Sequence, residues 1–338
     1  MDVHTAFLNG DMPADLILYM RQAPGYVLSE NPHKVYQLVK SIYGLKQAPR
    51  IWYNLLHKFL TSIGFERCNK EYCLYVQKVG DSNDDWLIVV VYVDDLTIVS
   101  RNAQLVKNLQ VELNKRFKMQ DLGDLHYILK MEVKRNRVDK TMSLSQTKYI
   151  HDLLAKFGVQ DSTAVSTPQV VGVDLVAEAI MTQDEIAKQP YDYRGLVGSL
   201  QYLVRGTRPD IANAVRELSK FLSCYNKTHW DAALRILKYL KGTSSYGLFI
   251  DGKMANVSYE VYTDASFASQ NNERKSITGY LIMIAGICIS WCSSKQACVA
   301  KSTAESEIIA LSEGVKESEW LSIYRDGIPS DKANGRMV

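Results

Sequence analysis

The sequence predicts an α+β fold, in which helices and strands occupy separate stretches of the chain. Short β-branched runs occur at residues 86–100 and again from residue 257 onward, whereas apolar residues with helical spacing occur between them. The length of 338 residues corresponds to roughly two domains of ~150 residues each. We therefore expect two lobes that mix helices with strands.

The first element in chain order is a hairpin. Residues 86–93 read as a buried strand, because the run Leu-Ile-Val-Val-Val is β-branched and too short for a typical helix. Residues 96–100 read as a second strand, which places Asp94 and Asp95 in the tight link between the two strands.

Four amphipathic helices follow, because apolar residues recur three or four positions apart. The second helix is expected to stop at Gly158, the third to open at Pro209, and the fourth to end at Gly242. The apolar faces of these helices lie at residues 105–117, 150–157, 211–222 and 230–240.

The remaining elements suggest a connection and a further domain. Residues 161–192 contain six acidic residues and one lysine, with two prolines, and we interpret 161–190 as an acidic surface connection. Strands at 257–263, 279–285 and 287–291 precede a helix at 304–323, which suggests a separate domain at 255–338.

Composition excludes several classes of protein. Hydrophobic residues make up 46% and charged residues 23% of the chain, which is typical of folded proteins, and a net charge of +3 does not indicate a partner. The longest apolar run is too short to span a bilayer, so no membrane partner is expected. The six cysteines form no Cys-x-x-Cys pair, which argues against a zinc site and favours a reducing, intracellular setting.

The pair Asp94-Asp95 is the sharpest chemical feature. Two adjacent carboxylates at a hairpin tip repel each other unless a cation is present, and Mg²⁺ prefers such oxygen ligands. A third carboxylate, for which Asp2 is a candidate, would allow two ions to act in phosphoryl chemistry. Alternatively, Asp94-Asp95 is a solvated turn and Asp2 belongs to a frayed end.

A series of longer motifs carries a resemblance to a known family. The chain resembles the reverse transcriptase and ribonuclease H region of a copia-type retrotransposon Pol polyprotein. The resemblance covers nearly the whole chain in one order. Its motifs include MDVHTAFLNGD at 1–11, SIYGLKQAPRIWY at 41–53, VVVYVDDLTIVS at 89–100, FKMQDLGDLHYILKMEV at 117–133, YRGLVGSLQYLVRGTRPDIANAV at 193–215, HWDAALRILKYLKGT at 229–243, YTDASFAS at 262–269 and the run at 274–311.

The resemblance implies polymerase palm, fingers and thumb regions followed by a ribonuclease H-like α/β domain. Residues 1–135 would form the reverse transcriptase palm and partial fingers, and residues 136–250 the thumb and connection. Residues 255–338 would form a ribonuclease H-like domain that is incomplete at its C-terminal end.

The resemblance also implies the polymerase site. Asp2, Asp94 and Asp95 would be the palm carboxylates that hold two Mg²⁺ ions for nucleotidyl transfer. Phe7 would lie under the incoming sugar and exclude a 2′-hydroxyl, and Tyr43 and Gly44 would contact the incoming nucleotide. Read individually, Phe7 could instead be ordinary core and Gly44 a turn before a helix.

Basic residues would contact the primer and template. Residues 201–245 contain eight Lys/Arg against three acidic residues and match the thumb of the family. Arg235, Lys238 and Lys241, on the side of the fourth helix that we expect to face solvent, would bind phosphates there. Lys130 lies in the hairpin that places the primer end, where the family has glycine; a positive φ at this position would cost Lys130 ~1–2 kcal/mol of strain.

A second catalytic centre is implied near the C-terminus. Asp264 ends the first strand of the ribonuclease H-like pattern, and Glu307 lies on the helix that follows; both would be metal ligands for cleaving an RNA–DNA hybrid. The third carboxylate of the family is not assigned, since Asp331 is only a weak match. We therefore expect this domain to be poorly stable and inactive by itself.

The function implied is RNA-directed DNA polymerase activity, with RNA template, DNA primer and dNTP as substrates and the rest of the Pol polyprotein as a partner. The expected location is a cytoplasmic nucleoprotein particle, with the nucleus as a second location. Because the chain begins one residue before Asp2 and lacks upstream fingers, an alternative is an inert transposon remnant that at most binds nucleic acid. A DNA-templated polymerase is a third reading.

Overall fold

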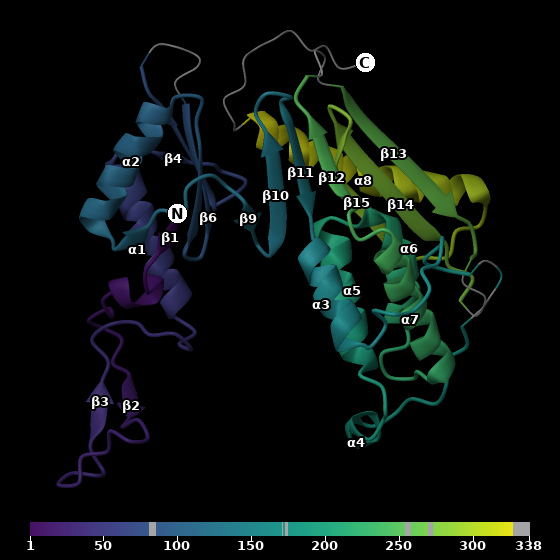
Figure 1. Cartoon of the computed structure of the whole chain (residues 1–338), viewed down its shortest axis with the longest axis horizontal. Helices are drawn as coiled ribbons and strands as arrows, with labels where there is room; N and C mark the ends of the chain where they lie inside the picture. Colours follow the sequence, from purple (N-terminus) through teal and green to yellow (C-terminus); the bar gives the residue numbers. More distant parts are fainter. Residues whose placement is uncertain (81–85, 171, 173–174, 254–257, 270–272, 327–338) are drawn as a thin grey trace. The chain divides into compact units, whose positions relative to one another are not determined.

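The computed structural model describes residues 1–80, 86–170, 172, 175–253, 258–269 and 273–326. Within them the chain divides into two compact units, Met1–Leu125 and His126–Trp320. Both units combine helices with antiparallel sheets (Figure 1), which confirms the mixed α and β fold. No helix in these parts of the chain is both long and apolar enough to cross a membrane.

The first unit is built on a six-stranded antiparallel sheet. The predicted hairpin is present, but Asp95 begins the second strand and pairs with Tyr92, so only Val93 and Asp94 form the link. The strands, in spatial order, are β4 (Glu66–Arg67), β5 (Leu74–Lys78), β6 (Trp86–Tyr92), β7 (Asp95–Val99), β1 (Asp2–Val3) and β8 (Met119–Gln120).

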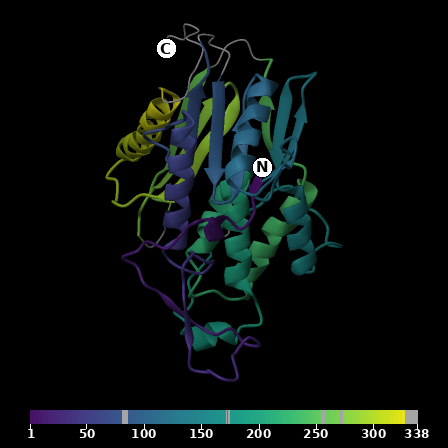
Figure 2. The same cartoon turned by 90° about the vertical axis from the view of Figure 1, so that its left-hand side faces the viewer.

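Helices α1 (Ala48–Ser62) and α2 (Ala103–Arg116) cover one face of this sheet (Figure 2). Trp52, Leu56 and Leu60 recur every four residues along α1, so all three lie on its buried side. They share a core with Val89 of β6, Leu96 of β7 and the apolar side of α2. Tyr92 and Asp95 lie on the opposite face of the sheet, which α1 and α2 do not cover.

A two-stranded ribbon of β2 (Tyr19–Arg21) and β3 (Val35–Gln37) extends from the first unit (Figure 1). Every residue of both strands is exposed. The short helix η1 (Ala6–Asn9) lies between β1 and this ribbon in the sequence.

The second unit contains a helical bundle. Its core is formed by α3 (Thr147–Lys156), α5 (Tyr193–Gly206), α6 (Ala212–Ser219) and α7 (Lys227–Gly242). Gly158 follows α3 with φ of 66°, as a helix stop requires, whereas Pro209 opens the short helix η2 (Pro209–Ile211) rather than α6 itself. The acidic connection contains the short helix α4 (Gln183–Ala187).

Two sheets complete the second unit. The first has the order β12-β11-β10-β9, with β9 (Tyr127–Ile128), β10 (Met131–Asn136), β11 (Thr141–Ser145) and β12 (Gly247–Asp251). The second has the order β13-β14-β15, with β13 (Tyr259–Ser266), β14 (Ile277–Ile284) and β15 (Ile287–Lys295), and is followed by α8 (Thr303–Asp326).

Helix α8 and the helical bundle contact opposite faces of the β13–β15 sheet. On one face α8 packs so closely that a Cβ at Gly314 would lie 2.6 Å from Cγ2 of Thr263. On the other face the bundle contacts β15, where Nε1 of Trp291 donates a 2.9 Å hydrogen bond to the carbonyl oxygen of Val204. This sheet therefore belongs to the same compact unit as the bundle. Asp331 lies outside the described residues.

Candidate active site

The backbone brings Asp2 and Asp95 together. Strand β1 pairs with β7, and Asp2 lies directly opposite Asp95. The amide of Val3 donates to the carbonyl oxygen of Asp94 at 2.9 Å, and the amide of Leu96 donates to Met1 at 2.8 Å. Directly opposed residues of an antiparallel pair point to the same face of the sheet. Both carboxylates therefore share the face that the helices leave open.

The carboxylates affect one another electrostatically. Partial burial raises the pKa of Asp95, and the negative charges of Asp94 and Asp2 raise it further, while the N-terminal amino group acts in the opposite direction. A raised pKa shows that Asp95 is poorly compensated when it is ionised. A cation at this place would remove that penalty, and carboxylate oxygens are the ligands that Mg²⁺ prefers.

The described side chains around Asp2 and Asp95 do not form a complete set of metal ligands. Within the described ranges, no group of three or more His, Cys, Asp and Glu side chains is arranged to hold a metal ion. The chemistry of Asp2, Asp94 and Asp95 nevertheless fits a divalent cation, because all three carry hard oxygen donors and two of them are neighbours in the ladder. Their role as metal ligands stays a prediction.

Trp52 anchors the turn that carries Asp94. Its Nε1 donates a 2.6 Å hydrogen bond to the carbonyl oxygen of Val93, and the side chain is only 2% exposed. Val93 has φ of 56°, which is rare and strained for a β-branched residue. Trp52 was not singled out in the sequence, although its position on the four-residue apolar stripe of α1 marks it as buried.

The predicted nucleotide-pocket residues are brought together. The rings of Phe7 and Tyr43 lie with their centroids 4.6 Å apart, and Oγ of Ser41 donates a 2.5 Å hydrogen bond to the carbonyl oxygen of Phe7. Tyr43 is 53% exposed, so one side of this ring pair is open to a ligand. Gly44 has φ of 96°, which requires glycine, while no atom lies close enough to require its small size.

Lys130 lies in a two-residue turn between β9 and β10. Leu129 has φ of 48° and Lys130 has φ of 59°, and the flanking residues Ile128 and Met131 are paired. Two consecutive left-handed residues in a two-residue hairpin correspond to a type I′ turn, which favours Asn-Gly. Lys130 therefore has the positive φ on which the expected strain depends, and this conformation costs roughly 1–2 kcal/mol.

The basic side chains of α7 are not all free to face solvent, which corrects that expectation. Lys241 donates to the carbonyl oxygen of Ser162 at 2.7 Å, and Arg235 donates to Oγ1 of Thr167 at 3.0 Å. The main chain of Lys238 accepts from Val165 at 3.4 Å. The connection segment covers this side of α7, because its backbone groups need partners and the helix supplies them.

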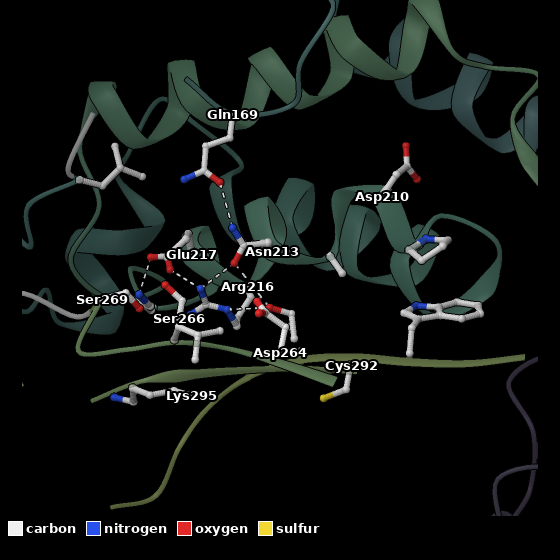
Figure 3. A pocket seen from close by; sticks show the side chains of 18 of the residues that line it. Gln169, Asp210, Asn213, Arg216, Glu217, Asp264, Ser266, Ser269, Cys292 and Lys295 are labelled. Atoms are coloured by element: carbon white, nitrogen blue, oxygen red, sulfur yellow. Dashed lines mark hydrogen bonds and ion pairs between the residues drawn. The ribbon is translucent and has the colours of Figure 1, made fainter. Parts of the chain in front are cut away.

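Asp264 lines a cavity of about 900 Å³ between the β13–β15 sheet and α6. Figure 3 shows Asp264 lying across from Arg216 and Asn213 of α6, with Ser266 beside it. Nε of Arg216 donates to Ser293 at 3.1 Å, and its Nη2 donates to Asn213 at 2.8 Å.

Glu307 lies on α8, which packs on the other face of the same sheet. Successive side chains of a strand point to opposite faces of the sheet. Thr263 faces α8 at Gly314, so its neighbour Asp264 points to the other face. The side chain of Glu307 is exposed. The structure therefore places Asp264 and α8 on opposite faces, and the pairing of Asp264 with Glu307 as metal ligands stays a prediction.

Comparison with known proteins identifies the family. The family model described as "Reverse transcriptase (RNA-dependent DNA polymerase)" matches residues 1–171. The chain belongs to this reverse transcriptase family. It is 41% identical over 328 residues to the retrovirus-related Pol polyprotein from transposon TNT 1-94 of Nicotiana tabacum, which covers 96% of this chain and 24% of the relative. These matches confirm the resemblance to a copia-type Pol polyprotein.

Two other relatives extend the comparison. The retrovirus-related Pol polyprotein from transposon RE2 of Arabidopsis thaliana is 37% identical over 321 residues, which is 95% of this chain and 21% of the relative. A putative transposon Ty5-1 protein of Saccharomyces cerevisiae is 32% identical over 319 residues, which is 94% of this chain and all of the relative. This reverse transcriptase chain thus spans about a fifth to a quarter of the two plant polyproteins.

Proposed function

We propose that this chain is the RNA-directed DNA polymerase of a copia-type retrotransposon and extends a DNA primer on an RNA template. The observation that carries the proposal is the register pair Asp2–Asp95 beside the turn that holds Asp94. Membership of the reverse transcriptase family supports it. The rest of a Pol polyprotein would be its partner, and a cytoplasmic nucleoprotein particle its location.

The reaction is an in-line displacement at phosphorus. The 3′-oxygen of the primer forms a bond to the α-phosphorus of the dNTP, the bond between that phosphorus and the bridging oxygen breaks, and pyrophosphate leaves with the electron pair. Asp2, Asp94 and Asp95 would hold two Mg²⁺ ions, which supply positive charge for the attacking and leaving oxygens when bound. The β1–β7 ladder and the Trp52–Val93 bond fix where these carboxylates stand.

The ring pair of Phe7 and Tyr43 supports a role in nucleotide selection. The backbone carbonyl of Phe7 accepts a hydrogen bond from Ser41, and its ring packs against the ring of Tyr43, so both the main chain and the ring have a partner. A Phe7 ring that lies under the incoming sugar would leave no space for a 2′-hydroxyl. The proposal therefore includes a preference for dNTP over rNTP.

The proposal includes a ribonuclease H-like part in the β13–β15 sheet and α8. Asp264 and Glu307 are its proposed ligands, and an RNA–DNA hybrid is its proposed substrate. Asp264 is exposed and lines the pocket beside α6, whereas Glu307 lies on α8, which packs on the other face of the sheet, so we expect only weak cleavage by this chain.

The test is primer extension on matched RNA and DNA templates with Mg²⁺. Replacing a metal-binding carboxylate removes charge that acts mainly in the transition state, so Asp94→Asn should lower the rate at least ~10³-fold, or ~4 kcal/mol. The exposed Asp15→Asn should leave the rate unchanged, because Asp15 lies outside the predicted site. Preference for the DNA template would instead favour a DNA-templated polymerase.

The alternative is a chain that binds nucleic acid without polymerising. It is favoured by one observation, namely that the described side chains form no group of three metal ligands. Salt-sensitive binding of primer–template without any incorporation would support this alternative. Incorporation that is lost in Asp95→Asn would rule it out.

A further inference from the structure

The tip of the β9–β10 hairpin adopts a conformation that its own residues disfavour. Leu129 and Lys130 both have positive φ, at 48° and 59°. A left-handed conformation costs an ordinary L-residue of this kind free energy, and such conformations persist only where the surroundings hold them. Something outside the turn must therefore stabilise it.

Tyr202 supplies that stabilisation. Its hydroxyl donates a 2.5 Å hydrogen bond to the carbonyl oxygen of Leu129, the first of the two left-handed residues. Tyr202 lies on α5 of the helical bundle, and its ring packs edge-to-face against Tyr149 of α3, with centroids 4.9 Å apart. The hydroxyl is thus aimed from two packed helices at the tip of the hairpin.

The other end of the hairpin is also attached to the bundle. A carboxylate oxygen of Glu132 accepts a 2.7 Å hydrogen bond from the amide of Lys148 in the first turn of α3. The amide of Val133 donates to the carbonyl oxygen of His126 at 2.9 Å. Glu132 therefore attaches the base of the hairpin to α3, and Tyr202 contacts its tip.

We propose that Tyr202 is a positioning residue that holds the Leu129–Lys130 turn, and through it the 3′ end of the primer, in place. The role of the turn toward the primer rests on the proposed function, whereas the hold of Tyr202 on the turn does not. Tyr202 does not touch the reacting atoms; it acts through the backbone of Leu129. This role takes over the stabilisation that Asn-Gly would give such a turn by itself.

The experiment first deletes the Tyr202 hydroxyl and then changes the turn to a sequence that is stable without it. Tyr202→Phe keeps the ring and deletes the donor. The turn variant Leu129→Asn with Lys130→Gly gives the sequence that type I′ turns prefer. Tyr149→Phe is the matched control, since it deletes a neighbouring hydroxyl and leaves the Tyr202–Leu129 bond intact. Amide hydrogen exchange of residues 127–135 and the rate of primer extension are measured in each variant and in the combination.

Tyr202→Phe should speed exchange in the hairpin about fivefold, as expected for the loss of one hydrogen bond. It should also lower the extension rate at saturating dNTP while leaving the KM for dNTP unchanged. In the Asn-Gly background both effects should fall below about twofold, which a merely structural role of Tyr202 in the bundle would not show. Tyr149→Phe should change neither quantity.

Unchanged exchange in Tyr202→Phe, or a loss that the Asn-Gly turn does not rescue, would overturn the inference. The hydrogen-exchange result tests whether Tyr202 stabilises the Leu129–Lys130 turn even if no variant polymerises. Absence of extension in the unaltered chain would count against the proposed function instead, so the two failures are distinguishable.

Discussion

Asp2 and Asp95 lie directly opposite each other in the antiparallel ladder between β1 and β7. The pairing places two carboxylates side by side on the open face of the sheet, with Asp94 in the adjoining turn. Two ionised carboxylates that lie opposite each other in a ladder repel one another unless a cation is bound or one of them is protonated. The first prediction concerns the cost of this arrangement when no metal is bound.

Asp95→Asn should stabilise the metal-free protein at neutral pH. The folded state raises the pKa of Asp95, because of burial and of the charges of Asp94 and Asp2, so its ionised form is disfavoured on folding. That penalty is absent below the normal carboxyl pKa of about 4 and develops as pH rises through the folded-state value. The melting temperature of the variant should exceed that of the unaltered chain by about 1–3 °C at pH 7.

This gain should shrink as pH falls toward about 4, where both proteins carry the same charge at this position. Thermal unfolding in a chelator across this pH range is the measurement. A variant that is less stable than the unaltered chain at pH 7 would contradict the electrostatic account.

Trp52→Phe should loosen the turn that carries Asp94. The variant keeps an aromatic ring in the core but loses the donor to the carbonyl oxygen of Val93, which then remains without that bond. We expect a loss of about 1–2 kcal/mol in the free energy of unfolding, measured with urea, together with slower primer extension.

Trp86→Phe is the control for Trp52→Phe. Trp86 also lies in the first unit, at the start of β6, and its ring contacts Lys78. If both variants lost stability and extension rate equally, the loss would reflect ring size and not the bond to Val93.

Asp210→Asn should destabilise the second unit strongly. The guanidinium of Arg208 is buried, with 1% of the side chain exposed, and donates to Asp210 at 2.9 and 2.7 Å. The variant leaves this cation without a compensating charge, which should cost about 2–4 kcal/mol in chemical denaturation. Asp231→Asn breaks the exposed pair with Lys227 and should cost less than about 1 kcal/mol.

The contribution of Asp210 should also depend on pH. Burial raises its pKa, but the hydrogen bonds and charge of Arg208 outweigh burial and lower it on balance. Stability from this group is therefore present above about pH 4 and is lost as pH falls through the lower folded-state pKa. The difference between Asp210→Asn and the unaltered chain should narrow over that acidic range, and a constant difference would argue against the ion pair.

Local sequence signals predicted the regular elements well. The hairpin of β6 and β7, the helices α2, α3 and α7 and the β13–β15–α8 order all follow from periodicity or stop residues. Helices α1 and α5 were missed, although both carry buried apolar residues at helical spacing. The β9–β10 hairpin followed only from the resemblance, because its turn is built from Leu129 and Lys130 instead of Asn-Gly, and strands β11 and β12 were missed.

Contacts between distant segments could not be read from the sequence. The bonds from Trp52 to Val93 and from Tyr202 to Leu129 join residues far apart in the chain, and neither leaves a local pattern. The same is true of the hydrogen bonds that Arg235 and Lys241 make with Thr167 and Ser162. Helical periodicity alone predicts that these two side chains face solvent. Asp95 was placed in the link because the second strand was expected to begin at residue 96, whereas it begins at Asp95, which pairs with Tyr92.

The most direct test of the shared metal site is Mn²⁺ binding followed by electron paramagnetic resonance. If Asp2 and Asp95 hold the same ion, Asp2→Asn and Asp95→Asn should each weaken binding at least about tenfold, and the double variant should bind no more weakly than the poorer single variant. Asp15→Asn should bind Mn²⁺ as the unaltered chain does. Normal binding by Asp2→Asn beside weak binding by Asp95→Asn would contradict the account.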